Sequence, residues 1–486
     1  MVPLGNLAAV ARSFLFQRLK WPVPMTRWRT AKEIRNLLND PGTRSSTIDA
    51  LLDYLDQCKA ESEVCEILTI VFLTLPVGRP THSAIAQRIH CPSILADTIL
   101  EQTYGLGSGI GGWEQAHSGQ APANFGGGNY FEEHNTAHIP PIFKNNLMKL
   151  ERTSGYPFLR HWAYEWKILG DKQGTRYTRY PQYFDEGLDA RSGIMGQYWQ
   201  RMREVFLSAY LRTLAYAVSE WGMPQRIAED YALDMVHGIA GLFDVEPTAR
   251  PTWLSDFPER FCASGADFTP LIRSLVGATR VDGMMLVSLD TPVSSSVRKY
   301  AQLLLSAHLV TPDYELADGA ILYEKLLLMP IAHILELKGP TARIKIQEAS
   351  VEGKLGDEVA VCNCLFPMPF GCWQGDYMKL GLKIPAPYVI QDSEIQCGHQ
   401  SIDCITSDGK IASRTRIWND NWVPQHPKSG STRCGTATMI DEGMLAEAME
   451  RLRRKLAFFI RLRIWDREKD YGEYLESEHT FFLPGL

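Results

Sequence analysis

The chain has 486 residues, of which 45% are hydrophobic and 22% charged, and its formal net charge is -6 at pH 7. This balance is that of an ordinary globular protein, and it argues against a dedicated nucleic-acid coat protein, which would be strongly basic. At roughly 100–200 residues per domain, the length predicts about three domains. No run approaches the roughly 18–20 apolar residues that cross a bilayer, so we expect no membrane partner.

The ten cysteines are irregularly spaced, which favours reduced thiols and a cytoplasmic location. The segment from Met1 to Lys32 has basic residues but no acidic one. That composition is typical of an organellar transit peptide or of an ordinary first helix, and we favour the helix.

Residues 1–103 are predicted to form a helical domain. Ile48, Leu51, Leu52 and Leu55 follow the spacing of one helix face, with Asp49, Asp53 and Asp56 outside it. Short helices of this kind suit an interaction or adaptor domain, and no catalytic motif accompanies them.

Residues 104–140 are rich in glycine, and we interpret them as a connector. Gly107, Gly109 and Gly112 match a dinucleotide fingerprint in spacing, but a helix is predicted before them where a strand is required. His134 and His138 have the spacing of a helical zinc pair, but Pro140 and Pro141 end any helix there, which favours a polar loop.

Residues 141–280 are predicted to form a second helical domain that contains a β-hairpin. The hairpin pairs Tyr164–Ile168 with Thr175–Tyr180 around a turn at 170–174. Its second strand combines aromatic rings with guanidinium groups, which can stack on bases and hold phosphates; the candidate nucleic-acid-binding residues are Arg176, Tyr177, Arg179 and Tyr180. The alternative is a half-buried sheet.

Two further helices are predicted in this domain, at Gly196–Trp221 and Gln225–Leu242. The first is apolar on most sides from Val205 on, and Gly222 to Pro224 separate it from the second.

Residues 281–435 are predicted to be mixed α/β and then β-rich. Met284–Leu289 has strand character, and a helix is expected after Ser294–Ser296 with Val297, Tyr300, Ala301, Leu304 and Leu305 on its apolar face. The apolar run Ile321–Lys338 favours a helix over a strand, although Pro330 would kink a helix.

One motif in this region suggests a metal-dependent nuclease. Asp313 follows Pro312, and Glu336 and Lys338 come later in the chain, which is the order of ligands in a large class of magnesium-dependent nucleases, the PD-(D/E)xK type. On a strand, Glu336 and Lys338 would lie on one side, so that Asp313 and Glu336 could hold Mg²⁺ and Lys338 could activate water. On a helix, the same side chains would diverge.

Strands are predicted at Arg343–Ile346, Glu358–Cys364, Tyr388–Gln391, Asp403–Thr406 and Lys410–Trp418, with a hairpin turn at Ser407–Gly409. Cys362/Cys364 and Cys397/His399 are each two residues apart, so each pair could direct two ligands to one side of a strand. Four such ligands would form a tetrahedral zinc site. The alternative is that the cysteines are small buried side chains.

Residues 436–486 are predicted to be a helix, Asp441–Ile460, and a charged tail. A basic cluster that includes Arg461 and Arg463 precedes an acidic one from Asp466 to Glu478. Mutual neutralisation is the simpler interpretation, and a basic patch for an acidic partner is the alternative.

The predicted fold class is therefore α+β and multidomain, with a helical N-terminal half, a mixed α/β centre and a β-rich C-terminal third closed by a helix. The sequence has no phosphate-loop lysine, no Gly-x-Ser-x-Gly and no His-Glu-x-x-His. The first hypothesis is a cytosolic binding or scaffold subunit of a larger protein assembly. The alternatives are a Mg²⁺-dependent nuclease and a nucleic-acid-binding protein that uses the hairpin.

Overall fold

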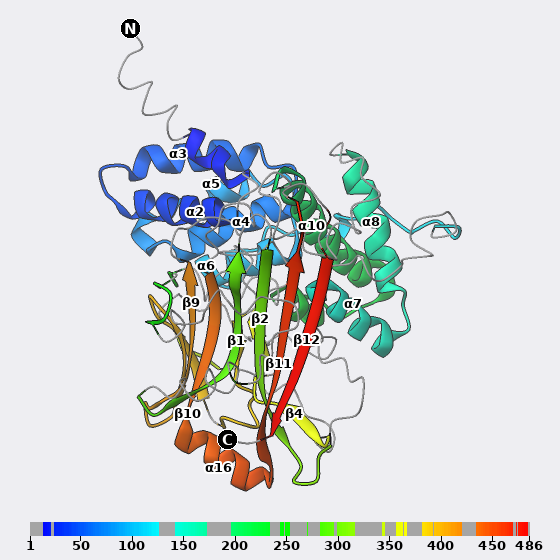
Figure 1. Ribbon diagram of the computed structural model, residues 1–486. Helices are drawn as coiled ribbons and strands as arrows, with labels where there is room; N and C mark the ends of the chain where they lie inside the picture. The colour runs from blue at the N-terminus through cyan, green and yellow to red at the C-terminus, as the bar shows by residue number, and fades with distance from the viewer. Residues whose placement is uncertain are drawn as a thin grey trace.

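The computed structural model describes residues 13–20, 24–125, 141–172, 196–233, 244–246, 248–252, 270, 282–295, 299–315, 343–345, 356–362, 364–366, 382–391, 393–419, 434–469, 473 and 475–484. Within these residues the N-terminal half is helical and the C-terminal half is an antiparallel sheet (Figure 1). The predicted α+β class is confirmed.

The helical half begins at a short turn near residue 18 and ends at residue 233. The side chains of Thr81 and Ser93 cap two of its helices by accepting hydrogen bonds from the backbone N–H groups of Ala84 and Ala96. Its elements are η1 (Arg18–Lys20), α2 (Pro24–Asn39), α3 (Arg44–Asp56), α4 (Glu61–Leu73), η2 (Pro76–Gly78), α5 (His82–Ala86), α6 (Ile94–Tyr104), η3 (Trp113–Gln115), α7 (Pro141–Ser154), α8 (Phe158–Lys172), α10 (Gly196–Trp221) and α11 (Gln225–Leu233).

Helix α4 lies at the centre of this half. Nearly all of its residues are buried, because α2, α6 and α10 pack around it. The resulting hydrophobic core draws its residues from Phe16 to Leu233 and from no strand.

The C-terminal half is built on one sheet, in which ten strands of the described residues take part. The order is β12-β11-β2-β1-β10-β9-β8-β7-β3, with β4 on β2, and β5 and β6 form a separate pair. The bounds are β1 (Met284–Ser295), β2 (Lys299–Val310), β3 (Arg343–Lys345), β4 (Glu358–Ala360), β5 (Cys364–Phe366), β6 (Leu382–Ile384), β7 (Ser393–Cys397), β8 (Ile402–Thr406), β9 (Ile411–Asn419), β10 (Cys434–Asp441), α16 (Glu442–Leu452), β11 (Lys455–Asp466) and β12 (Leu475–Pro484).

The sheet has its own hydrophobic core. Alternate residues of β2, such as Leu303, Leu305 and Ala307, enter it together with Phe458 and Ile460 of β11, as the period of two along a strand requires. The residues of this core run from Val245 to Ile464, so it shares none with the helical core.

Several predicted elements are confirmed. Helix α10 has the predicted bounds, Gly196–Trp221, and β8 and β9 form the predicted hairpin around the turn at residues 407–409. Among the helices that the structure describes, none has both the length and the apolar character needed to cross a bilayer.

The prediction that Tyr164–Ile168 forms the first strand of an aromatic and basic hairpin is wrong, because these residues lie inside helix α8. The buried residues of α8 recur at Phe158, Trp162, Glu165, Trp166 and Leu169. That spacing is one face of a helix, and it extends beyond the five residues from which a strand was inferred.

The helix predicted after Ser294–Ser296 is also wrong, because this stretch forms β2, between β1 and β11. Leu304 and Val310 are apolar on the face opposite the core. A strand that is apolar on both faces has no clean period of two, so it is easily mistaken for a helix.

The C-terminal helix is shorter than predicted. It ends at Leu452, and Arg453 adopts a left-handed conformation with φ 53, after which the chain reverses into β11. The predicted charge neutralisation is confirmed for two residues of the basic cluster, because Arg461 and Arg463 of β11 pair with Glu478 and Glu476 of β12. The strand predicted at Tyr388–Gln391 is instead largely a turn.

Candidate functional site: a groove beside helix α3

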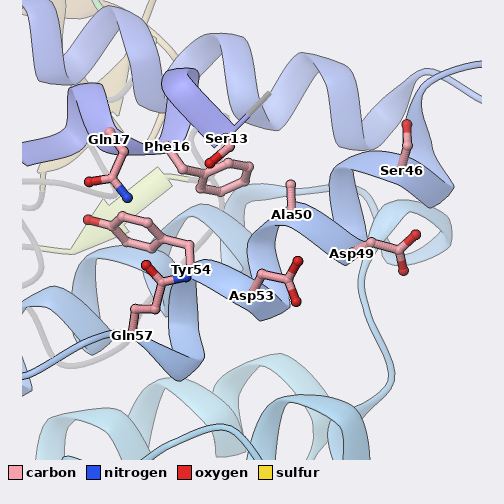
Figure 2. Close-up of a pocket in the computed structure, with 9 residues that line it drawn as sticks. All are labelled: Ser13, Phe16, Gln17, Ser46, Asp49, Ala50, Asp53, Tyr54 and Gln57. Carbon is pink, nitrogen blue, oxygen red and sulfur yellow. The ribbon is translucent and has the colours of Figure 1, made fainter. Parts of the chain in front are cut away.

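A groove with a cavity volume of about 200 Å³ lies between residues 13–17 and helix α3 (Figure 2). We call it the α3 groove. Its lining residues are Ser13, Phe16, Gln17, Ser46, Asp49, Ala50, Asp53, Tyr54 and Gln57.

The sequence of α3 explains why these side chains share one side of the helix. Ser46, Asp49, Ala50 and Asp53 are three or four residues apart, which is the repeat of one helix face. Leu51 and other apolar residues point instead into the helical core. The prediction that Asp49 and Asp53 lie outside the apolar face of this helix is therefore confirmed.

Two aromatic rings form the inner wall of the groove. Phe16 and Tyr54 are buried, and their ring centroids are 5.6 Å apart. The ammonium group of Lys20 lies 5.2 Å from the centroid of the Tyr54 ring and 2.9 Å from the Glu63 carboxylate. Tyr54 therefore already holds one cation over its ring.

Asp49 and Asp53 are exposed, and neither forms an ion pair with a described residue. They are one helical turn apart, so both carboxylates can approach the same cation. The amides of Gln17 and Gln57 also line the groove, and their oxygens accept hydrogen bonds. This set of groups suits a guanidinium or ammonium group beside an aromatic wall.

The size of the α3 groove limits what it can hold. Pockets for metabolites and cofactors are roughly 300–1,000 Å³ in volume, whereas this groove measures about 200 Å³. It is therefore better suited to one side chain of a partner than to a complete small molecule.

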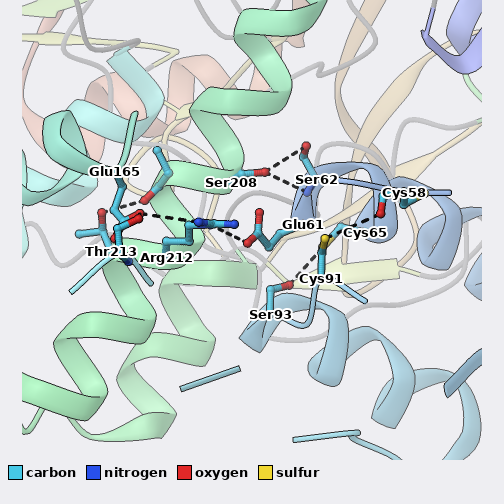
Figure 3. A network of polar contacts seen from close by, with 12 residues as sticks. Cys58, Glu61, Ser62, Cys65, Cys91, Ser93, Glu165, Ser208, Arg212 and Thr213 are labelled. Atoms are coloured by element: carbon cyan, nitrogen blue, oxygen red, sulfur yellow. Dashed lines mark hydrogen bonds and ion pairs between the residues drawn. The ribbon is translucent and has the colours of Figure 1, made fainter. Parts of the chain in front are cut away.

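A second cluster of charged groups lies inside the helical half (Figure 3). The Arg212 Nε lies 2.6 Å from Glu61 Oε1, and its Nη1 lies 4.0 Å from Glu165 Oε2. Ser118 donates its backbone N–H to Glu165 over 2.5 Å and its hydroxyl over 2.8 Å. These contacts connect α4, α8 and α10 with the loop after η3.

This buried network is structural. Burial raises the pKa of Glu61, and the Arg212 charge opposes that shift. Burial also acts to raise the pKa of Glu165, but the His161 imidazole, 3.6 Å away, and two hydrogen bonds from Ser118 outweigh it and leave that pKa lowered. Both carboxylates are almost completely buried, so a substrate in solvent could not reach them.

The thiols near this network are packing groups. Burial raises the pKa of Cys65 to about 12 and that of Cys91 to about 11, and it also raises the pKa of Cys58. The Sγ of Cys65 lies 3.5 Å from the Ser93 hydroxyl. A thiol that stays protonated is a poor nucleophile and a poor metal ligand.

A polar cluster on the sheet was not found from the sequence. His308 Nε2 lies 3.1 Å from Ser306 Oγ, and its Nδ1 lies 2.8 Å from Glu358, which also accepts a 2.8 Å hydrogen bond from Tyr314. Burial, followed by the Glu358 contact, raises the pKa of Tyr314 to about 12. Ser306 is 1% exposed, so we interpret the cluster as structural: it stabilises the pairing of β4 with β2.

Sequence spacing places Ser306 and His308 on one face of a strand, which is the only signal that could have indicated this cluster. Glu358 is fifty residues further along the chain. Only the pairing of β2 with β4 brings Glu358 close to His308.

The proposed nuclease residues are only partly described. Asp313 is exposed, in the turn that follows β2, whereas Glu336 and Lys338 lie outside the described residues. In the part of the chain that the structure describes, no three His, Cys, Asp or Glu side chains gather in a way that could hold a metal ion. The nuclease hypothesis therefore stays a prediction.

The proposed nucleic-acid-binding residues Arg176, Tyr177, Arg179 and Tyr180 lie outside the described residues as well. Only the preceding segment can be compared, and it is helical. Binding of nucleic acid at this position stays a prediction.

The proposed zinc ligands lie in and next to strands. Cys362 and Cys397 are buried, and burial raises the pKa of Cys397 to about 12. His399, in contrast, is 66% exposed and lies 3.6 Å from Glu246. Cys364 lies in β5, and its side chain is outside the described part. The zinc hypothesis stays a prediction.

No protein-family model matches this sequence, and no curated protein is significantly similar to it.

Proposed function

We propose that this protein acts by binding a protein partner, as one subunit of a larger assembly, and that the α3 groove receives a basic side chain of that partner. The observation that supports this most directly is the pair of exposed carboxylates, Asp49 and Asp53, beside the Phe16–Tyr54 wall, with no cation among the described residues to pair them.

A basic side chain suits this groove better than a metal ion does. Hard cations such as Ca²⁺ take six or more oxygen ligands, and a metal site built from two carboxylates alone would be weak. A guanidinium group instead pairs with carboxylates through several N–H donors and stacks on aromatic rings. The two carboxylates and two amides that line the groove match the hydrogen-bonding requirement, and the edges of the buried Phe16 and Tyr54 rings form its apolar wall.

The groove contributes only part of the affinity for a partner. Exposed ion pairs are worth about 0.2–1 kcal/mol each, so two of them change a dissociation constant by about 2- to 30-fold. Tight association therefore needs further contact area, which agrees with the role of a subunit in an assembly.

The experiment measures ligand binding by saturation-transfer NMR, with N-acetyl-argininamide, N-acetyl-lysinamide and N-acetyl-citrullinamide as probes. Citrulline has nearly the shape of arginine but no charge. We expect the two cationic probes to bind better than the citrulline probe, and D49N/D53N to remove the difference by weakening the cationic probes about 2- to 30-fold.

The matched control is Asp171→Asn, which neutralises an exposed carboxylate at the end of α8. This variant should bind like the wild type. If citrulline binds as well as arginine, or if D49N/D53N has no more effect than Asp171→Asn, the proposed function is wrong.

A further inference from the structure

Strand β12 is the end strand of the sheet, beside β11 (Figure 1). Its ten residues pair with β11 in one unbroken register, from Leu475 opposite Asp466 to Pro484 opposite Ala457. No described residue pairs with its other side. Such an edge has backbone N–H and C=O groups that another strand can use.

The two faces of β12 differ. Glu476, Glu478 and Thr480 alternate on one face and are exposed, whereas Phe481 and Leu483 on the other face pack against the core of the sheet. Leu475, which is 72% exposed, lies on this second face, but Ser477 and His479 separate it from Phe481. An added strand would therefore meet two carboxylates on one face, and on the other an exposed leucine followed by two polar side chains.

The two glutamates already have arginines on one side. Arg461 of β11 pairs with Glu478, and Arg463 pairs with Glu476. Each of these glutamates keeps 37% of its side chain exposed. A cation on an added strand could therefore approach from the open side and complete a row of alternating charges across three strands.

Charge also decides which strand fits. Natural edge strands often have charged residues that prevent edge-to-edge association. A second copy of β12 contains no lysine or arginine that could pair with Glu476 and Glu478. The same carboxylates attract a strand with lysine or arginine at alternate positions.

We propose that β12 accepts an extended segment of a partner protein as an additional antiparallel strand. The segment has lysine or arginine beside Glu476 and Glu478, and an apolar side chain next to the exposed Leu475. This surface is distinct from the α3 groove, and it would provide the further contact area that tight association requires.

The test uses three dye-labelled ten-residue peptides and fluorescence anisotropy. The first alternates lysine with valine, the second has glutamate in place of lysine, and the third is the lysine peptide with every backbone nitrogen methylated, so that neither of its edges can donate a hydrogen bond. We expect only the first to bind, because the second is repelled by the carboxylates and the third cannot form the backbone hydrogen bonds of a strand.

The variant E476Q/E478Q should weaken the lysine peptide about 2- to 30-fold. Glu468→Gln, an exposed carboxylate just after β11, should have no effect, and neither should D49N/D53N in the α3 groove. Hydrogen exchange should show that the peptide protects the amides of β12.

Three results would overturn the proposal. The methylated peptide could bind as tightly as its parent, which excludes strand addition. D49N/D53N, rather than E476Q/E478Q, could weaken binding, which places the peptide in the α3 groove. Sedimentation could show a dimer that E476Q/E478Q strengthens or leaves unchanged and that the lysine peptide cannot displace, which makes a second copy the occupant of the edge.

Discussion

At the scale of single residues, the buried charge of Arg212 has the largest predicted effect. Its guanidinium group contacts Glu61 and lies near Glu165, and all three side chains are mostly or completely buried. Removing one partner of a buried ion pair destabilises the fold by more than the intact pair stabilises it, because the remaining charge is buried without water and without a counterion.

We therefore expect Arg212→Met to lower the free energy of unfolding by about 3–5 kcal/mol, measured by chemical denaturation followed by circular dichroism. Arg226→Met, at an exposed position of α11, should cost little. Adding Glu61→Gln to Arg212→Met should recover part of the loss, because it removes a buried charge that has lost its counterion. No recovery would mean that packing, not charge, explains the effect of Arg212.

The buried thiols give a second residue-scale prediction. Because the pKa of Cys65 is raised to about 12 and that of Cys91 to about 11, almost no thiolate is present near pH 8. Iodoacetamide followed by mass spectrometry should modify the half-buried Cys91 before Cys65, and Cys65 only in denaturant. Equal modification of both thiols in the native protein would contradict the burial described here.

At the scale of elements, β10 depends on one glycine. A Cβ atom at Gly435 would lie 2.4 Å from the Trp418 ring of β9 and 2.8 Å from the Asp290 backbone oxygen of β1. The backbone oxygen cannot move without disturbing the pairing of β1 with β10. The position therefore tolerates no side chain.

We therefore expect Gly435→Ala to lower the free energy of unfolding by at least about 1–3 kcal/mol, the usual cost of overpacking a core. Gly356→Ala is the matched control, since a Cβ there would meet only the Glu358 backbone oxygen at an ordinary 3.9 Å. The check is thermal unfolding followed in the β-sheet region of the infrared spectrum. Equal stability of the two variants would show that β1, β9 and β10 have room to shift.

Elements with a clear local pattern were predictable from the sequence. Helix α10 has apolar residues on most sides and a Gly222–Pro224 stop, and the β8–β9 hairpin has Gly409 at its turn with φ 88. Strand β2 was not predictable, because consecutive residues from Leu305 to Val310 are all buried, so the two faces of the strand do not differ clearly. Strand β11 was missed because the left-handed turn at Arg453 leaves no glycine or proline in the sequence to mark it.

The candidate site was predictable only in part. The period of α3 places Asp49 and Asp53 on the solvent side, which the sequence indicates. The opposite wall of the groove comes from residues 13–17, and no local pattern shows that this segment lies beside α3.

At the scale of the whole molecule, residues 244–246 and 248 contact both of the halves that have separate cores. Arg35 of α2 forms two hydrogen bonds with Asp244, at 2.7 and 2.9 Å, and Lys32 lies 2.6 Å from Glu246. On the other side, the backbone N–H of Thr248 donates to Ile417 of β9. Polar connections of this kind allow the halves to move relative to each other more readily than a shared core would.

Reversing one charge of this connection should uncouple the halves. We expect Arg35→Asp to separate thermal unfolding, measured by scanning calorimetry, into two transitions, and R35D/D244R to bring them closer again. If the double variant behaves no better than the single one, the Arg35–Asp244 pair does not couple the two halves.

The connection should also weaken in acid. The hydrogen bond from Lys32 is the main reason why the pKa of Glu246 is lowered from its ordinary value of 4.5. A carboxylate with a lowered folded pKa stabilises the fold fully above its ordinary pKa and loses that contribution as the pH falls through the lowered value. The difference in unfolding temperature between wild type and Lys32→Met should therefore be constant above about pH 6 and shrink toward pH 3; a difference that does not change with pH would exclude this pair as its source.

The separation of the two cores has a consequence for substitutions that disrupt only one half of the chain. A substitution such as Gly435→Ala would disrupt the strands while leaving Phe16, Tyr54 and the two aspartates of α3 in place, because they belong to the other core. If the α3 groove and β12 bind as proposed, such a chain would still bind a partner through the groove but could not accept the partner's strand at β12. It would then compete with intact chains for the partner, so this substitution should impair assembly more than loss of the whole chain does.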